Sequence, residues 1–292
     1  MTMIKYKWTL LLSGFMLALA AVFLLQGGGR PAASEDLSDP FLDPYALSLA
    51  HRHAGPGSET EAEKTIRLTP SWPEGKPQAG SPALLAIKIS NGEGRPVNEF
   101  AVTNEKLMHL IIVSSDLQHF QHVHPEYNGE GAFELPVVFP TSGDYKIYAD
   151  FQPAGMNELT RSDQMTVLGQ PPEPEPLQPS ETLTASVEGM KVTLEFEDAP
   201  APQSATSMTY TFTDEETGEP IKDLELYLGA VGHAVAIHES TEHFLHIHPL
   251  NWASSGPQAA FGVSFPGSGK YKLWGQFQRR GKTFVVPFVI NV

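Results

Sequence analysis

The sequence predicts an all-β protein made of two tandem immunoglobulin-like sandwiches that follow an N-terminal transmembrane helix. Three observations lead to this fold class. An uncharged apolar run stands near the N-terminus, short alternating strand-like runs recur from residue 64 onward, and the second half of the chain repeats the first. The 292 residues suffice for two domains of ordinary size, each with its own core.

Residues 1–26 are predicted to form a membrane anchor or signal segment. Lys5 and Lys7 precede 19 uncharged residues, Trp8 to Gln26, a run close to the roughly 20 residues that span the hydrocarbon layer. The apolar run continues past a cleavage-like Ala-Leu-Ala, which favours an uncleaved anchor over a signal peptide. Lysines before the segment and acids after it predict a single-pass protein of the cell membrane, with most of the chain outside the cytoplasm.

Composition then divides the rest of the chain. Residues 27–63 are rich in Gly, Pro, Ala and acidic side chains, which predicts a flexible stalk. Strand-like runs such as "LLAIKIS" and "LMHLIIV" place the first sandwich at 64–168. A proline-rich linker follows at 169–180, and runs such as "KVTLEFED" and "HAVAIH" place the second sandwich at 181–292.

The second sandwich is an internal copy of the first. Gly94-Arg-Pro96 matches Gly218-Glu-Pro220, 124 residues later, and the motif Phe139-Pro-Thr-Ser-Gly143 matches Phe265-Pro-Gly-Ser-Gly269, 126 residues later. Roughly seven short strands in each copy are typical of an immunoglobulin-like sandwich.

Charge and cysteine content exclude several classes of function. With 34 acidic and 19 basic residues the net charge is −15, which argues against binding nucleic acid or anionic membrane surfaces. The absence of cysteine excludes disulfides, thiolate nucleophiles, cysteine zinc sites and blue-copper centres. The chain also has no nucleophile elbow, phosphate-binding glycine loop or metalloprotease helix motif. We therefore expect a binding protein, not an enzyme.

Histidines carry the most specific signal. The stretch "HFQHVHP", His119 to Pro125, recurs as "HFLHIHP", His243 to Pro249. Over the 17 aligned positions that run from His109 and from His233, six are identical, and these include all four histidines of each copy. The eight candidate metal ligands are His109, His119, His122, His124, His233, His243, His246 and His248.

Strand geometry groups these histidines. If Val113 pairs with Phe120 across a predicted hairpin, then His109, His122 and His124 fall on one face of a sheet. The same register in the second copy groups His233, His246 and His248.

Three neutral imidazoles with a fourth position open suit Zn²⁺, Cu²⁺ or Ni²⁺. We expect one such site in each sandwich, with His119 and His243 as possible fourth ligands and Asp116 or Glu126 as alternatives in the first copy. Affinity should be lost below roughly pH 6 as imidazoles protonate. Other readings are structural histidines that pack and hydrogen-bond, a pH-sensing imidazole cluster, and a site for a non-metal ligand.

The segments "MHLIIVSSDLQHFQHVHP" and "FPTSGDYKIYADF", with their second copies, resemble YtkA-like and related copper-associated β-sandwich proteins, which bacteria secrete or anchor in the membrane. The resemblance covers about residues 65–168 and 183–292. It implies an extracytoplasmic immunoglobulin-like domain and metal handling. Some of those proteins bind copper through an N-terminal histidine, and this chain has none at a plausible processed end.

The sequence therefore predicts a membrane-tethered extracytoplasmic protein that binds a divalent transition metal, copper or zinc, for buffering or delivery. Two alternatives remain. One is an envelope interaction or adhesion module with structural histidines and an envelope protein as partner, and the other is a metal-dependent enzyme.

Overall fold

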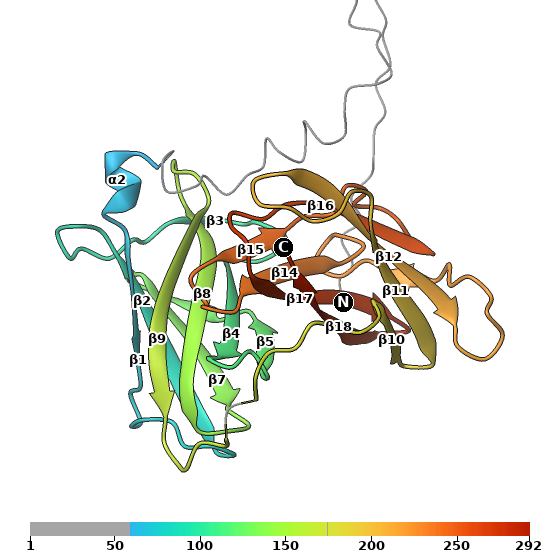
Figure 1. Cartoon of the computed structure of the whole chain (residues 1–292). Coiled ribbons are helices and arrows are strands. Elements are labelled where there is room, and N and C mark those ends of the chain that lie inside the picture. Colours follow the sequence, from blue (N-terminus) through green and yellow to red (C-terminus); the bar gives the residue numbers. More distant parts are fainter. Residues whose placement is uncertain (1–58, 174) are drawn as a thin grey trace, which may run out of the picture. The chain divides into compact units, whose positions relative to one another are not determined.

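The computed structural model describes residues 59–173 and 175–292, which form two β-sandwiches in tandem (Figure 1). All of these residues fall within one compact unit of the chain. The predicted all-β class is confirmed, since each sandwich has two sheets and the one helix in the described part is the four-residue α2, Glu61–Lys64. The predicted anchor, 1–26, and the stalk as far as residue 58 lie outside the described residues. Within the described ranges, no helix has the length and apolarity needed to cross a membrane.

The first sandwich contains nine antiparallel strands in two sheets. One sheet has the order β1 (Arg67–Ser71), β2 (Pro82–Ser90), β7 (Ala132–Val138) and β6 (Glu126–Gly129). The other has the order β3 (Phe100–Ala101), β8 (Gly143–Pro153), β4 (Met108–Ser114) and β5 (Phe120–Val123), and β9 (Leu159–Val167) also pairs with β8.

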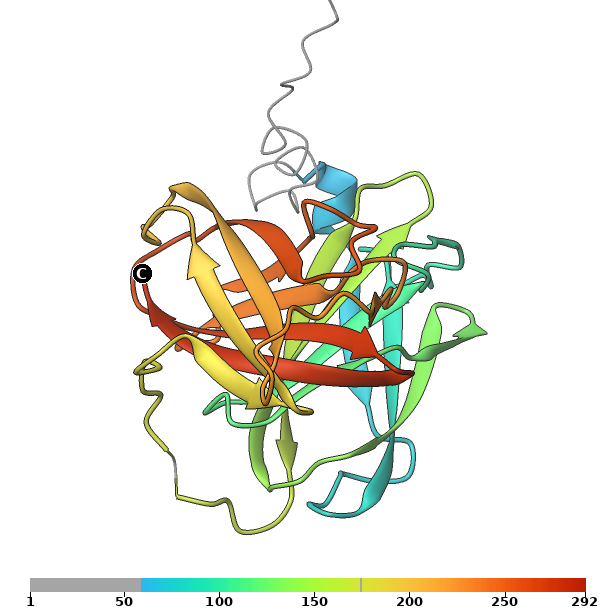
Figure 2. The same ribbon diagram turned by 90° about the vertical axis from the view of Figure 1, so that its right-hand side faces the viewer.

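The second sandwich repeats this order. One sheet runs β10 (Thr184–Val187), β11 (Met190–Phe196), β12 (Ala205–Asp214) and β16 (Gln258–Ser264). The other runs β13 (Leu224–Glu225), β17 (Lys270–Arg279), β14 (His233–His238) and β15 (Phe244–Ile247), and β18 (Lys282–Asn291) pairs along the length of β17 (Figure 2). The two copies differ at the sheet edges, because β6 has no second-copy strand and β10 has no first-copy strand.

Each sandwich encloses an apolar core built by the period-two alternation of its strands. In β12, Met208, Tyr210 and Phe212 are fully buried while their neighbours are more exposed. Phe133 and Phe151 take the same role in the first core. Inward side chains from the two sheets of each sandwich fill the space between the sheets, as expected for a β-sandwich.

Strands β4 and β14 are buried on both faces, which alternation alone does not predict. In β4, Leu110 and Ile112 point into the first core, whereas Ile111 and Val113 join a separate apolar cluster. That cluster, which we call the junction cluster, also contains side chains of the second sandwich. Its fully buried members are Ile111, Val113, Leu117, Tyr148, Val235, Ile237 and Trp274. The outer faces of β4 and β14 therefore pack the two sandwiches against each other.

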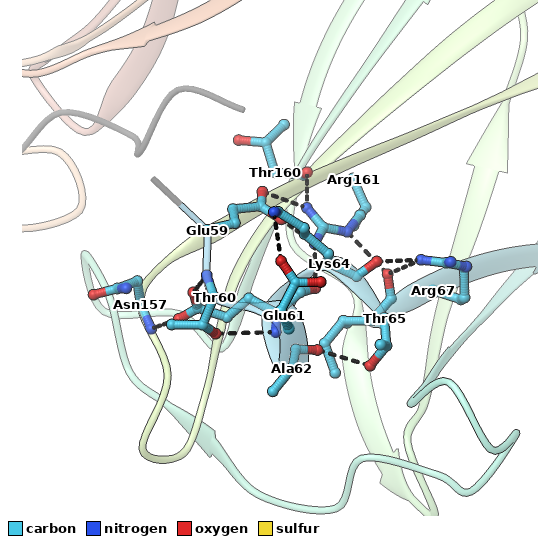
Figure 3. Close-up of polar contacts among 12 residues, drawn as sticks. Glu59, Thr60, Glu61, Ala62, Lys64, Thr65, Arg67, Asn157, Thr160 and Arg161 are labelled. Carbon is cyan, nitrogen blue, oxygen red and sulfur yellow. Dashed lines mark hydrogen bonds and ion pairs between the residues drawn. The ribbon is translucent and has the colours of Figure 1, made fainter. Parts of the chain in front are cut away.

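The start of the described chain is held against β9 (Figure 3). Helix α2 begins with a capping box, in which the Thr60 hydroxyl accepts from the Glu63 N–H and the Glu63 carboxylate accepts from the Thr60 N–H. The Glu63 carboxylate also accepts from the N–H of Asn157 at 2.7 Å. Arg161 donates from both terminal nitrogens to the carboxylate of Glu59, at 3.0 and 2.9 Å. Residues 59–63, which we expected in the stalk, thus form part of the folded unit.

Candidate metal centre

The hairpin of β4 and β5 has the register that the sequence predicted. Val113 lies opposite Phe120, and the pairing continues to Leu110 opposite Val123. The side chains of His109, His122 and His124 consequently share one face of the sheet. This face looks away from the first core and carries the junction cluster.

The three imidazoles converge on one point. Nδ1 of His109 lies 3.1 Å from Nε2 of His122 and 3.2 Å from Nε2 of His124. One nitrogen of each ring lies within 4.8 Å of the others. His109 is fully buried, His122 is 9% exposed, and His124 is half-buried. This three-histidine group could hold a metal ion.

The opposite nitrogens of two of these rings are bound to acceptors. Nε2 of His109 donates to the backbone oxygen of Thr103 at 3.0 Å, and Nδ1 of His122 donates to Oε1 of Gln276 at 2.8 Å. A neutral imidazole carries one N–H, so the lone pairs of these rings lie on His109 Nδ1 and His122 Nε2. Two lone pairs then face each other at 3.1 Å, an arrangement that a cation between them would stabilise.

Tight turns place the acceptors for the β4 and β14 histidines. In the turn Thr103–Lys106, Asn104 and Glu105 have φ values of 47° and 66°, and the Thr103 and Lys106 backbones bond to each other. Positive φ at both central residues is typical of a type I′ turn, which matches the strand twist. The second copy has the same turn at Tyr227–Ala230, with positive φ at both central residues. Its first carbonyl oxygen, on Tyr227, accepts from His233 Nε2 at 3.0 Å.

The second set of histidines lies against the first. The ring centroids of His109 and His233 are 6.1 Å apart, and those of His122 and His246 are 6.2 Å apart. His248 stacks on His246 with centroids 5.0 Å apart. We expected one separate site in each sandwich, but the structure brings both sets together at the junction. The reason is that the histidine faces of β4 and β14 are the faces through which the sandwiches pack.

Burial favours the neutral form of four of these rings, those of His109, His122, His124 and His233. Desolvation lowers the pKa of His109 and, together with the neighbouring imidazoles, holds that of His122 well below its usual range. Burial is also the main reason that the pKa of His124 falls to about 3 and that of His233 to about 4. Neutral imidazole is the form that binds metals. Proton competition should therefore set in at lower pH than the roughly pH 6 expected for unperturbed histidines.

The predicted fourth ligands lie outside this group. His243 is exposed and contacts His238, with ring centroids 5.5 Å apart. His119 stands at the end of the β4–β5 loop, within which Asp116 accepts hydrogen bonds. Glu126 is exposed on β6. None of these residues belongs to the converging group of His109, His122 and His124.

Two residues that the sequence did not single out hold the rings across the junction. Gln276 of the second sandwich accepts from His122, and Asp150 of the first accepts from His246 Nδ1 at 2.8 Å. Both occupy the same position in their copies, 126 residues apart, next to a β4 or β14 histidine in the ladder. The signal that could have revealed them is a polar residue at the matching position of both copies, directly before the shared Phe151 and Phe277.

Comparison with known proteins identifies the family. A family model described as "Domain of unknown function (DUF8832)" matches residues 59–167 and again 185–292. These matches cover more than half of the chain, so the chain belongs to this family and carries its domain twice. No curated protein sequence matches the chain.

Solved structures similar to the chain include two bacterial surface proteins. The Escherichia coli adhesin FdeC is 16% identical with a TM-score of 0.25, over 78% of this chain and 64% of that one. Invasin, a bacterial integrin-binding protein, is 11% identical with a TM-score of 0.22, over 77% and 39%. The chain thus spans less than two thirds of either structure, and these low scores transfer no function to it.

Proposed function

Because the family description names no activity, we propose from the site itself that this chain binds a divalent transition-metal ion through His109, His122 and His124. The observation that carries the proposal is the pair of facing lone pairs on His109 Nδ1 and His122 Nε2. Both are fixed by acceptors on the far side of each ring. Such outer hydrogen bonds orient histidine ligands in metal sites.

The donor set favours zinc or copper(II). All three ligand atoms are imidazole nitrogens, which suit Zn²⁺ and Cu²⁺. Met108, the one thioether next to the site in sequence, is fully buried in the first core, on the opposite face of β4. A soft cuprous site with methionine ligation is therefore disfavoured. The resemblance of the histidine motif to copper-associated proteins supports copper within this pair.

The proposed role is binding, in buffering or delivery, and not catalysis. A metal-dependent enzyme needs a positioned acid or base beside the open coordination position. The carboxylate of Asp150, 0% exposed, accepts from His246 Nδ1 at 2.8 Å and from the Thr160 hydroxyl at 2.5 Å. It therefore acts as an orienting group. The apolar N-terminal run, with lysines before it and acidic residues after it, supports a membrane-tethered, extracytoplasmic setting.

The test is titration of the full, tag-free, metal-stripped chain with Zn²⁺ and Cu²⁺. The first equivalent should bind well below 0.1 mM, an affinity of about −5.5 kcal/mol. The variant His122→Ala/His124→Ala should lose it. The matched control is His119→Ala, in the same hairpin but outside the group, which should bind as the parent does. Equal binding by parent and double variant would contradict the assignment.

A second candidate has its own supporting observation. The hydrogen bonds of His122 to Gln276 and of His246 to Asp150 cross the junction, which also fits a purely structural role in an envelope interaction module. In that case the double variant would lower the melting temperature equally with and without metal. Metal binding instead predicts that the parent gains more stability than the double variant when one equivalent of metal is added.

A further inference from the structure

The junction between the sandwiches is self-complementary. Phe120 of the first sandwich stacks on Trp274 of the second, with centroids 4.8 Å apart and planes at 14°. In return Phe244 of the second stacks on Tyr148 of the first, at 4.4 Å and 10°. Phe120 and Phe244 are equivalent positions in the repeat, and so are Tyr148 and Trp274. In each copy the equivalent phenylalanine thus stacks on an aromatic ring of the other copy, as in the isologous interface of a two-fold dimer.

The histidine hydrogen bonds also cross between equivalent positions of the two copies. His122 of the first copy bonds Gln276 of the second, and the equivalent His246 bonds the equivalent Asp150. An approximate two-fold axis therefore relates the two histidine sets. A metal position on one side of such an axis implies an equivalent position on the other.

The second set supplies an independent sign of a missing ligand. His233 is 1% exposed, and its Nε2 donates to the Tyr227 oxygen at 3.0 Å. Its Nδ1 is buried with no hydrogen-bond partner in the described part of the chain. Burying such an acceptor without a partner is costly. This atom is the counterpart of His109 Nδ1, which lies in the first group.

We infer that the junction holds a second metal ion, bound by His233, His246 and His248, so that the two repeats share one two-metal centre. This inference rests on the proposed function at the first group. A two-metal centre would explain why the domain is duplicated, because each metal position takes its ligands from one sandwich and its orienting residue from the other.

Asp150 distinguishes the second position from the first. Its carboxylate is 0% exposed and accepts from His246 Nδ1, which in the neutral ring leaves the lone pair on Nε2. A buried carboxylate is stabilised by nearby positive charge. A carboxylate behind a histidine also raises the basicity of the ring as a metal ligand. The equivalent residue behind His122 is the neutral Gln276.

The second position is also less preformed. The rings of His246 and His248 stack with planes at 22°, and the Trp252 ring stacks on that of His248 with centroids 5.9 Å apart. His248 is half-buried and Trp252 is 42% exposed. The first group should fill before the second.

Copper(II) titration of the full chain, followed by electron paramagnetic resonance, tests this inference. Two equivalents should bind. The second should broaden the spectrum of the first and produce a half-field signal, since the facing rings are about 6 Å apart. His248→Ala and, separately, His233→Ala should remove the second equivalent and keep the first. Asp150→Asn, which preserves shape, should weaken the second about 10- to 100-fold. The control is His243→Ala, which should change neither.

The possible failures are distinct. No tight binding at all overturns both the proposed function and this inference. One equivalent, insensitive to His248→Ala and to His233→Ala, overturns the inference alone. Two equivalents without magnetic interaction, with the second removed by His243→Ala, would place the second ion at His238 and His243 and also overturn it.

Discussion

The two copies of the histidine motif share their strand and turn scaffold. They differ in how closely their imidazoles converge and in the charge of the residue that accepts a hydrogen bond from a ring nitrogen. Both present a β-strand histidine anchored to the carbonyl of a tight turn, at 3.0 Å in each copy. Nitrogens of the first group converge within 4.8 Å of one another, and Gln276 accepts from its His122; the second set does not converge in this way, and the buried carboxylate of Asp150 accepts from its His246. Divergence has therefore kept the parts that fix ring orientation and changed the part that sets electrostatics.

The largest expected effect comes from breaking the junction itself. Trp274 is 3% exposed and stacks on Phe120, so Trp274→Ala should lower the free energy of unfolding by about 3–5 kcal/mol. Denaturant unfolding of the metal-free chain measures this. Trp252→Ala, at a tryptophan 42% exposed, is the control and should cost less than about 1 kcal/mol. Equal costs for the two variants would show that the sandwiches are not packed through Trp274.

Acid should destabilise the metal-free chain through the buried imidazoles. The pKa of His233 is lowered to about 4 in the folded state, so below the unfolded value near 6.5 the unfolded chain binds more protons. Stability is thus full above about pH 6.5 and falls as the pH drops toward 4. For His233 alone the loss between pH 7 and pH 5 is about 2 kcal/mol. Unfolding at the two pH values should show it, and His233→Ala should have a shallower pH dependence. An equal dependence in the variant would contradict a buried neutral His233.

Exchanging the orienting residues tests whether the carboxylate of Asp150 and the amide of Gln276 affect metal affinity differently. Gln276→Glu would give His122 the carboxylate partner that His246 has, and it should tighten the first metal equivalent about tenfold, or roughly 1.4 kcal/mol. Calorimetric titration of the metal-stripped variant measures this. Gln278→Glu, two residues along the same strand, serves as the control for added charge. Unchanged affinity in Gln276→Glu would mean that the residue behind His122 does not influence the metal.

The smallest effect is expected at a motif histidine outside the cluster. His243 is exposed, so His243→Ala should change the free energy of unfolding by less than about 0.5 kcal/mol and leave the first metal affinity unaltered. Thermal unfolding and titration check both values. A large loss of metal affinity would mean that His243 is a metal ligand, as the sequence suggested.

The sequence predicted the repeat, the β class and the register of the β4–β5 hairpin. Those features are local, because a period of two and a short loop determine which residues of Leu107–Val123 face each other. It also grouped His109, His122 and His124 correctly on one face.

The sequence did not predict that the histidine face of β4 and β5 packs against the second sandwich. Alternation sorts residues onto two faces but does not say whether the outer one meets water or another domain. A signal was present in β4, where Leu110 to Val113 is apolar without a break, a pattern typical of strands buried on both sides. Asp150 and Gln276 join the site through the docking of two sandwiches, a contact between residues more than 90 positions apart in the chain.

Anomalous X-ray diffraction at the zinc edge, from crystals of the full chain grown with one equivalent of Zn²⁺, would locate the ion bound by this protein. We expect one strong peak about 2.0–2.1 Å from Nδ1 of His109 and from Nε2 of both His122 and His124. A peak elsewhere, such as between His238 and His243, or an ion-free cluster with the rings bonded only to each other, would contradict it.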